Sequence, residues 1–314
     1  MKSIVTLTVN PTVDINTDVS QVLPEKKLRC GRPRRDPGGG GVNVARAVHR
    51  LGGDATALYL AGGPPGEMLC DLLEGEGVAH RALPVDEWTR ENLIVYEEAS
   101  GLQYRFGMPG PTVEEAEWRR CLDELAALDP TPDYLVASGS LPPGMPEDFF
   151  GHVAEVARDG GAHLIVDTSG EPLRHAVEVG TFMLKPNLRE LRELVGEELE
   201  GEHEQVDAAR HLVECGQVEV LVLSLGAGGA LVVTAESVTP IRTPTVPIRS
   251  KVGAGDSMVG GTVLALARGW ELLAAVRFGV AAGAAAVMTA GTELCRREDT
   301  ERLYAEMQEG MEGE

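Results

Sequence analysis

The sequence predicts an α/β protein with a mainly parallel central sheet and a small antiparallel sheet beside it. Two observations predict this class. Short apolar runs alternate with segments of helical spacing along most of the 314 residues, which is typical of a parallel sheet covered by helices. Near residues 93–106 the rhythm changes to two consecutive strand-like runs around Ala99-Ser100-Gly101, which indicates a hairpin.

Short apolar runs are expected to form the central sheet. The first alternates β-branched and small residues and ends at Asn10-Pro11, a turn signal. The run at 218–224 is apolar almost throughout, which predicts a strand buried on both faces. The runs at 230–233 and 238–241 predict a hairpin. In chain order the other expected strands are 4–9, 55–60, 134–137, 162–167 and 181–184.

Segments of helical spacing separate these strands. The first follows a break of four glycines at 38–41 and stops at Gly52-Gly53. The last two are rich in Ala and Gly, which lets helices pack closely. In chain order the expected helices are 42–51, 66–76, 114–128, 146–159, 188–195, 204–215, 256–268 and 272–288.

A small separate sheet is expected from two inserted segments, approximately 12–36 and 88–108. The first of them is extended between Val19 and Arg34, with apolar residues among charges. One face of such a sheet needs cover, from the main body or from a second subunit. No repeat or linker divides the chain, so we expect a single domain spanning 1–314.

Composition excludes several classes of function. The net charge is −21, which argues against nucleic-acid or anionic-membrane partners because both require a basic surface. An anionic substrate would therefore need a local basic pocket. The five cysteines are scattered without a C-x-x-C pair, and no run has the length of a signal peptide or a membrane span. We expect a cytoplasmic protein with a small-molecule substrate.

The segment 252–257 carries the strongest chemical signal. Gly253 and Gly255 allow close backbone approach, and the first N–H groups of the helix that follows form an anion site, to which Ala254 contributes. Asp256 stands where a carboxylate could take a proton from a hydroxyl that attacks a phosphate. From this segment alone, a helix N-cap behind a glycine turn is the favoured interpretation of Asp256.

A second signal is Lys185-Pro186-Asn187-x-x-Glu190. Pro186 keeps Lys185 extended, so its ammonium can reach beyond the end of the strand. Asn187 and Glu190 share one helix face and could hold Mg²⁺ directly or through water. The same pair could form a capping box, and the spacing does not separate the two.

The remaining candidate binding features are glycine-rich loops and the arginines of the small sheet. Glycine-rich loops at 37–43, 138–144 and 224–229 follow or precede strands, where α/β proteins bind ligands, although each could be a plain connection. Arginines on the small sheet suit bidentate phosphate contacts, or could simply be solvated. No Walker A, complete G-x-G-x-x-G, H-E-x-x-H or G-x-S-x-G motif is present.

Four of these segments occur in one order: 37–43, 185–190, 224–226 and 253–256. In this order the chain resembles the ribokinase/PfkB family of sugar kinases, over roughly residues 4 to 304. Several segments also resemble the corresponding sequences of family members that act on fructose 6-phosphate. These segments are 28–30, 38–47, 88–93, 98–106, 138–144, 253–260 and 277–283.

The resemblance implies a ribokinase-like three-layer α/β/α sandwich whose small sheet is a lid, and a homodimer in which two lids pack together. It implies Mg·ATP-dependent phosphorylation of fructose 6-phosphate at its 1-hydroxyl, giving fructose 1,6-bisphosphate and ADP. Fructose 1-phosphate or tagatose 6-phosphate are alternative substrates, and a non-catalytic sugar-phosphate sensor is the alternative class.

The resemblance also implies roles for individual residues. The base would be Asp256, beside the backbone N–H groups of Gly253, Ala254 and Gly255. The sugar would contact Asp14, Gly39, Asn43 and Ser140, and its phosphate would contact Lys27, Arg90 and Arg105. ATP would face Lys185, Asn187, Ser224, Gly226, Ala227 and Gly229, with Mg²⁺ at Asn187 and Glu190. In many members K⁺ binds beside the segment that corresponds to 284–293.

Overall fold

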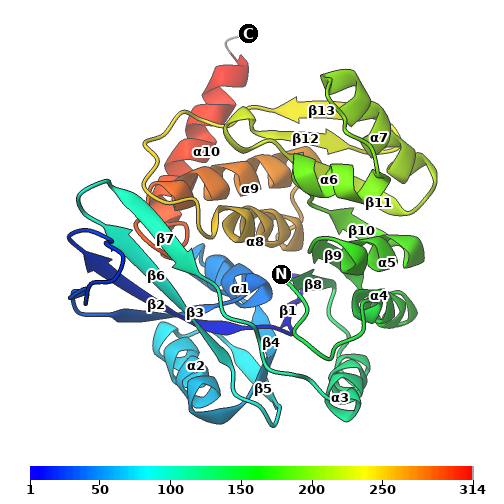
Figure 1. Cartoon of the computed structure of the whole chain (residues 1–314). Helices are drawn as coiled ribbons and strands as arrows, with labels where there is room; N and C mark the ends of the chain where they lie inside the picture. Colours follow the sequence, from blue (N-terminus) through cyan, green and yellow to red (C-terminus); the bar gives the residue numbers. More distant parts are fainter. Residues whose placement is uncertain (313–314) are drawn as a thin grey trace.

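A computed structural model describes residues 1–312 and builds them around one large sheet (Figure 1). The strands of this sheet are β1 Ile4–Thr8, β4 Thr56–Ala61, β5 His80–Pro84, β8 Tyr134–Ser138, β9 His163–Asp167, β10 Thr181–Leu184, β11 Val218–Ser224, β12 Ala230–Val233 and β13 Val238–Ile241. Their order is β13-β12-β11-β10-β9-β8-β1-β4-β5. The strands from β11 to β5 are parallel, and the hairpin β12–β13 extends the sheet antiparallel at one edge.

Helices cover both faces of this sheet, as the alternating pattern predicts. One face carries α1 Gly40–Arg50, α2 Gly63–Glu76, α8 Ala254–Ala267, α9 Leu272–Val287 and α10 Arg297–Glu312. The other carries α3 Glu115–Ala126, α4 Phe149–Gly160, α5 Glu171–Val179, α6 Leu188–Val195 and α7 Glu202–Glu214. Each face has its own apolar core, so the three-layer α/β/α arrangement is confirmed.

The glycines of α8 explain why this helix can lie so close to its neighbours. A Cβ at Gly261 would stand 2.9 Å from Cβ of Ala282 on α9, and a Cβ at Gly260 would stand 2.8 Å from Cβ of Ala47 on α1. Both distances are shorter than real Cβ contacts. The close packing expected from the Ala- and Gly-rich helices is therefore confirmed, and it holds α8 directly against α1 and α9.

A second sheet of four strands stands beside the main sheet, and we call it the lid. Its strands are β2 Thr12–Val19, β3 Arg34–Gly38, β6 Arg90–Glu97 and β7 Leu102–Phe106, in the order β3-β2-β6-β7. The outer pairs are antiparallel as expected, whereas the central pair β2–β6 is parallel. Both central strands leave the main sheet after a parallel strand, β1 or β5, and so enter the lid in the same direction.

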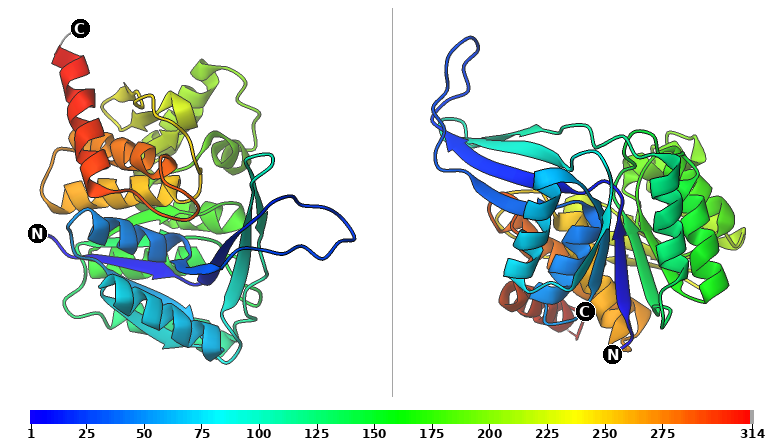
Figure 2. Two further views of the ribbon diagram at one scale, coloured as in Figure 1. Left: turned by 90° about the vertical axis from the view of Figure 1, so that its left-hand side faces the viewer. Right: turned by 90° about the horizontal axis from the view of Figure 1, so that it is seen from below.

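The structure differs from the sequence prediction in one extended stretch and in several strands and helices. Most of the stretch 19–34 is a loop that projects away from the rest of the chain (Figure 2). The strands β2, β3 and β5 and the helices α5 and α10 were not predicted as individual elements, although β2 lies within the expected lid segment 12–36. β3 has the sequence Arg-Arg-Asp-Pro-Gly, because an edge strand tolerates charges and proline. Within residues 1–312, no helix combines the length and apolar character that crossing a bilayer would demand.

Candidate active site

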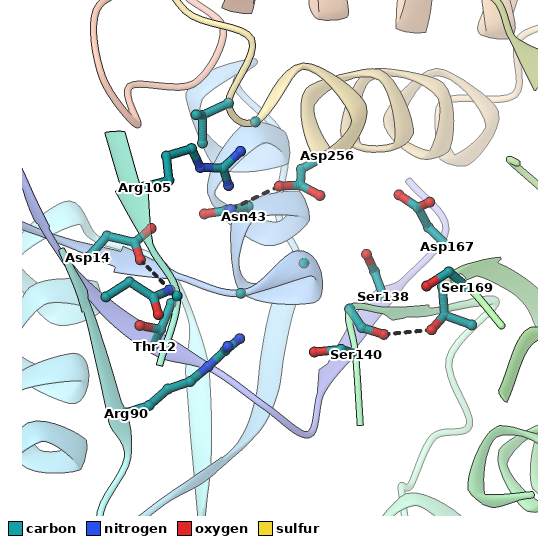
Figure 3. A pocket seen from close by; sticks show the side chains of 18 of the residues that line it. Thr12, Asp14, Asn43, Arg90, Arg105, Ser138, Ser140, Asp167, Ser169 and Asp256 are labelled. Carbon is teal, nitrogen blue, oxygen red and sulfur yellow. Dashed lines mark hydrogen bonds between the residues drawn. The ribbon is translucent and has the colours of Figure 1, made fainter. Parts of the chain in front are cut away.

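A pocket of about 600 Å³ lies where the carboxyl ends of central strands meet the lid (Figure 3). Loops after β8 and β9 form one wall, the starts of α1 and α8 form the base, and the lid forms the opposite wall. This is the edge at which open α/β sheets bind ligands. The structure brings to this pocket nine of the predicted site residues: Asp14, Gly39, Asn43, Arg90, Arg105, Ser140, Glu190, Gly253 and Asp256.

Glycine backbone forms the base of the pocket beside α1. Gly39 has φ +111°, and a Cβ at Gly40 would lie 2.3 Å from Oγ of Ser138 and 2.7 Å from N of Gly139. A side chain at Gly40 would therefore push α1 away from the loop after β8. The glycine run predicted as a break is thus a close backbone contact between two elements of the site.

Asp256 lies in the first turn of α8 and is not its N-cap. Gly253 occupies the cap position with φ 74°, so Ala254, Gly255 and Asp256 are the first three helical residues. The interpretation of Asp256 as a cap is wrong, because the helix starts three residues earlier. The first N–H groups of α8 have no partner within the helix, which leaves them available to an anion.

The surroundings of Asp256 favour its neutral form at low pH. Burial and the negative charge of Asp167 raise the pKa of Asp256 to about 7, although Asn43, Lys185 and Arg46 lower it in part. Asn43 Nδ2 donates a hydrogen bond of 2.9 Å to Oδ2 of Asp256 (Figure 3). A carboxylate with a pKa near neutrality can accept a proton from a hydroxyl and later release it.

Asp167, at the end of β9, lines the pocket and was not among the predicted residues. It pairs with Lys185, with 3.1 Å between Oδ1 and Nζ. Burial acts to lower the pKa of Lys185, but the nearby carboxylates of Asp167, Glu190 and Asp256 outweigh it and raise that pKa. Lys185 thus stays charged beneath the pocket, about 3.5 Å from where a Cβ at Gly255 would stand, and does not line it.

The lid supplies two arginines to the pocket. Arg90 is held by the main-chain oxygens of Asn10, at 2.9 Å, and Met108, at 3.2 Å. Arg105 lies on the neighbouring strand β7 and also points into the pocket (Figure 3). Two guanidinium groups on one wall make the local basic site that an anionic substrate requires.

Asp14 lies among these cations. Its Oδ1 accepts a hydrogen bond of 3.1 Å from Asn92 Nδ2, and burial raises its pKa. Thr12, Asn92 and Lys251 also line the pocket and were not predicted. The register Thr12↔Arg90 and Asp14↔Asn92 places the lid residues on one face, which depends on the parallel pairing of β2 with β6.

The capping-box interpretation of Asn187 and Glu190 is confirmed. Asn187 Oδ1 accepts from N of Glu190 at 3.0 Å, and Glu190 Oε2 accepts from N of Asn187 at 2.8 Å. Glu190 also lines the pocket, and burial raises its pKa. Within the described chain, no group of three or more His, Cys, Asp or Glu side chains could hold a metal ion.

Several predicted residues do not line this pocket. Ser224 ends β11 and its Oγ donates to O of Pro186 at 3.2 Å. The turn after it, Gly226–Gly228, is a short 3₁₀ helix closed by Leu225 N donating to O of Gly229 at 2.8 Å. Lys27 lies in the projecting loop. The predicted residues outside the pocket lining are Lys27, Lys185, Asn187, Ser224, Gly226, Ala227, Gly229, Ala254 and Gly255.

A pocket between a lid and the carboxyl ends of parallel strands fits the ribokinase-like sugar kinases that the sequence resembles. The pfkB family of carbohydrate kinases matches residues 7–299, and the chain belongs to this family. The ATP-dependent 6-phosphofructokinase isozyme 2 of Mycobacterium tuberculosis is 48% identical over 301 residues, 96% of this chain and 88% of that protein.

Solved structures of phosphofructokinase-2 from Escherichia coli are similar to the whole chain. The complex with potassium has a TM-score of 0.94 at 44% identity, and covers 98% of this chain and 100% of its own. The complex with fructose-6-phosphate has a TM-score of 0.92 at 43% identity, with the same coverage. The ribokinase-like fold expected from the sequence is therefore confirmed.

Proposed function

We propose that this kinase transfers the γ-phosphoryl group of ATP to the 1-hydroxyl of fructose 6-phosphate, forming fructose 1,6-bisphosphate and ADP. The observation that carries the proposal is the placement of Asp256. A carboxylate whose burial raises its pKa to about 7 stands in the first turn of α8, across the pocket from the lid arginines. The names of the relatives support the choice of sugar.

Asp256 accepts the proton of the 1-hydroxyl while the hydroxyl oxygen forms a bond to the γ-phosphorus. The bond from that phosphorus to the bridging oxygen breaks, and its electrons leave with ADP. Backbone N–H groups of Gly253, Ala254 and Gly255 stabilise the charge on the transferred group, since they are unpaired at the start of α8.

The lid orients the sugar. Arg90 and Arg105 bind the 6-phosphate, which directs the other end of the sugar toward Asp256. The sugar hydroxyls contact Asp14, Gly39, Asn43 and Ser140, which line the same pocket. Lys27 is the third proposed phosphate contact, and it lies in the projecting loop outside the pocket of its own chain.

ATP is proposed to bind at the ends of β10 and β11, near Lys185, Asn187, Ser224 and the turn of Gly226, Ala227 and Gly229. Glu190 fits a magnesium ion beside the phosphates, because its carboxylate lines the pocket. The amide oxygen of Asn187 already caps α6, so this residue would act through water. When bound, Mg²⁺ neutralises charge on the phosphates. Exchanging K⁺ for tetramethylammonium tests the monovalent cation expected beside 284–293.

A coupled assay of ADP release tests the proposal, with fructose 6-phosphate, fructose 1-phosphate and tagatose 6-phosphate compared at equal concentrations. We expect the highest kcat/KM for fructose 6-phosphate. A preference for either other sugar would retain the kinase and refute the substrate. Binding of sugar phosphate without ADP release from any of the three would favour the sensor instead.

We also propose a homodimer that pairs the lids of two subunits, acting in the cytoplasm. Strands β6 and β7 expose large apolar side chains, with Tyr96 46%, Leu102 60% and Phe106 47% accessible. Apolar surface of this kind favours a partner. Analytical ultracentrifugation should find a dimer that Leu102→Asp weakens and that Ile248→Asp, at an equally exposed site outside the lid strands, does not. A monomeric wild type would refute the pairing.

A further inference from the structure

Arg46 is a fully buried cation that the proposed reaction does not use. It lies on α1, one turn after Asn43, and its side chain is 1% exposed. An uncompensated charge in such a place is strongly unfavourable, so its partners are informative. The guanidinium binds Glu76 of α2 through two bonds, with Nε to Oε2 at 2.8 Å and Nη2 to Oε1 at 2.6 Å.

The remaining nitrogen of Arg46 points toward the site. Nη1 donates to O of Pro37 at 2.7 Å and to Oδ1 of Asn43 at 3.1 Å. Pro37 belongs to β3 of the lid, and Asn43 contacts Asp256. One guanidinium group is thus connected to the lid, to α2 and to the side chain beside the proposed base.

The contact with Arg46 determines which end of the Asn43 amide faces Asp256. An amide presents either an oxygen or an NH₂ group to a neighbour. With Oδ1 accepting from Arg46, Nδ2 donates to Asp256. The reverse orientation would place an amide oxygen against the carboxylate of Asp256 and an NH₂ group against a guanidinium, so both contacts would be repulsive.

We propose that Arg46, held by Glu76, is a positioning residue that locks the Asn43 amide as a donor to Asp256. This inference rests on the proposed function, because Asp256 must be the base. Since Asn43 occupies Oδ2 of Asp256, the carboxylate is fixed in orientation, and its other oxygen is left to meet the substrate hydroxyl.

Other charges also act on these groups and determine the size of the effect. The groups that influence Asp256 most are Asp167, Asn43, Lys185 and Arg46, while Glu190 and Lys251 line the same pocket. The groups that influence Glu76 are Arg46, Arg50 and His49. Because Arg46 lowers the pKa of Asp256, its removal should raise that pKa further.

The pH dependence of kcat/KM for the sugar phosphate tests the inference. In Arg46→Met we expect the acid limb to move at least half a pH unit upward and kcat to fall about tenfold, with KM for ATP unchanged. Arg46→Lys keeps a charge and a donor and should recover part of the rate. Arg50→Gln is the matched control, because Arg50 also approaches Glu76, at 3.8 Å, but makes no described contact with Asn43.

Wild-type kcat and an unmoved acid limb in folded Arg46→Met would overturn the inference. If Arg46→Met does not fold, Glu76→Gln tests the same inference. A kcat at least threefold lower than that of the wild type, with unchanged KM for ATP, would support the inference. A wild-type kcat in Glu76→Gln would overturn it. Asp256→Asn separates the two proposals. If it retains turnover, the proposed function fails, whereas an inactive Asp256→Asn beside a normal Arg46→Met refutes the positioning role alone.

Discussion

Replacing Asp256 with asparagine should remove most of the enzyme activity and, at neutral pH, make the folded protein more stable. The ionised carboxylate of Asp256 is disfavoured by its burial and by the negative charge of Asp167, which raise its pKa from 3.8 to about 7. A shift of about 3 units corresponds to about 4 kcal/mol at 1.36 kcal/mol per unit, which is the upper bound for destabilisation by the ionised form. Asparagine removes this charge, and its amide oxygen can still accept from Asn43.

The sign of the pH dependence follows from the direction of the shift. In the unfolded chain the carboxyl group loses its proton near pH 3.8, and in the folded protein near pH 7. Between these values the folded state binds more protons, so stability falls as the pH rises. The destabilisation is absent below pH 3.8, grows through this window and is complete above pH 7. Asparagine does not titrate, so the advantage of Asp256→Asn over the wild type grows across the same window.

The measurement is urea unfolding of both proteins at pH 5.5 and pH 8, together with turnover. Between pH 5.5 and 7 the window spans about 1.5 units, so the stability difference between variant and wild type should increase by about 2 kcal/mol. Turnover should fall by about 10²- to 10⁴-fold, which is the usual contribution of a general base. Asp71→Asn, at an exposed position on α2, should change neither quantity. A stability difference that is equal at both pH values would refute the argument for a desolvated carboxylate.

Three further predictions follow from the pocket. Arg105→Ala should raise KM for the sugar phosphate at least tenfold and leave KM for ATP unchanged; steady-state kinetics that show an unchanged sugar KM would exclude the phosphate contact. Gly40→Ala should lower both the melting temperature and the activity, because its Cβ would stand 2.3 Å from Oγ of Ser138. Gly75→Ala has open space around it and should lower neither. Equal losses of melting temperature in the two variants, measured by calorimetry, would contradict this. Asp167→Asn should move the acid limb of the pH–kcat/KM profile downward, since Asp167 raises the pKa of Asp256, and an upward shift would reverse the assignment.

The sequence predicts the repeating elements of this fold well because their signals are local. Strands such as β11 are apolar runs, and helices such as α1 follow glycine breaks. The missed elements lack such signals. β5 is an edge strand of His-Arg-Ala-Leu-Pro, and α10 carries many charged side chains, because both lie at the surface. Their positions depend on tertiary contacts that no short window contains.

The same distinction applies to the site. Asp256, Asn43 and Gly253 stand in compact motifs, and the structure places them together. Asp167 is the last residue of an ordinary strand and joins the site because β9 lies beside β8, with Asp167 opposite Ser138. The parallel pairing of the two central lid strands could not be inferred from the hairpin signals, because it depends on how both strands leave the main sheet.

The base of the pocket restricts how this enzyme can diverge. At Gly40 and Gly41 the chain lies so close to its neighbours that an added Cβ would stand 2.3 Å from Ser138 and 2.5 Å from the main chain of Leu7. Substitutions at these two glycines would displace α1, so the residues at the base of the pocket cannot vary freely. The opposite wall consists of side chains on the lid strands, whose backbone can remain in place when residues change. A descendant enzyme with another sugar would therefore acquire its new specificity through the lid, while the phosphoryl-transfer end of the pocket stayed as it is.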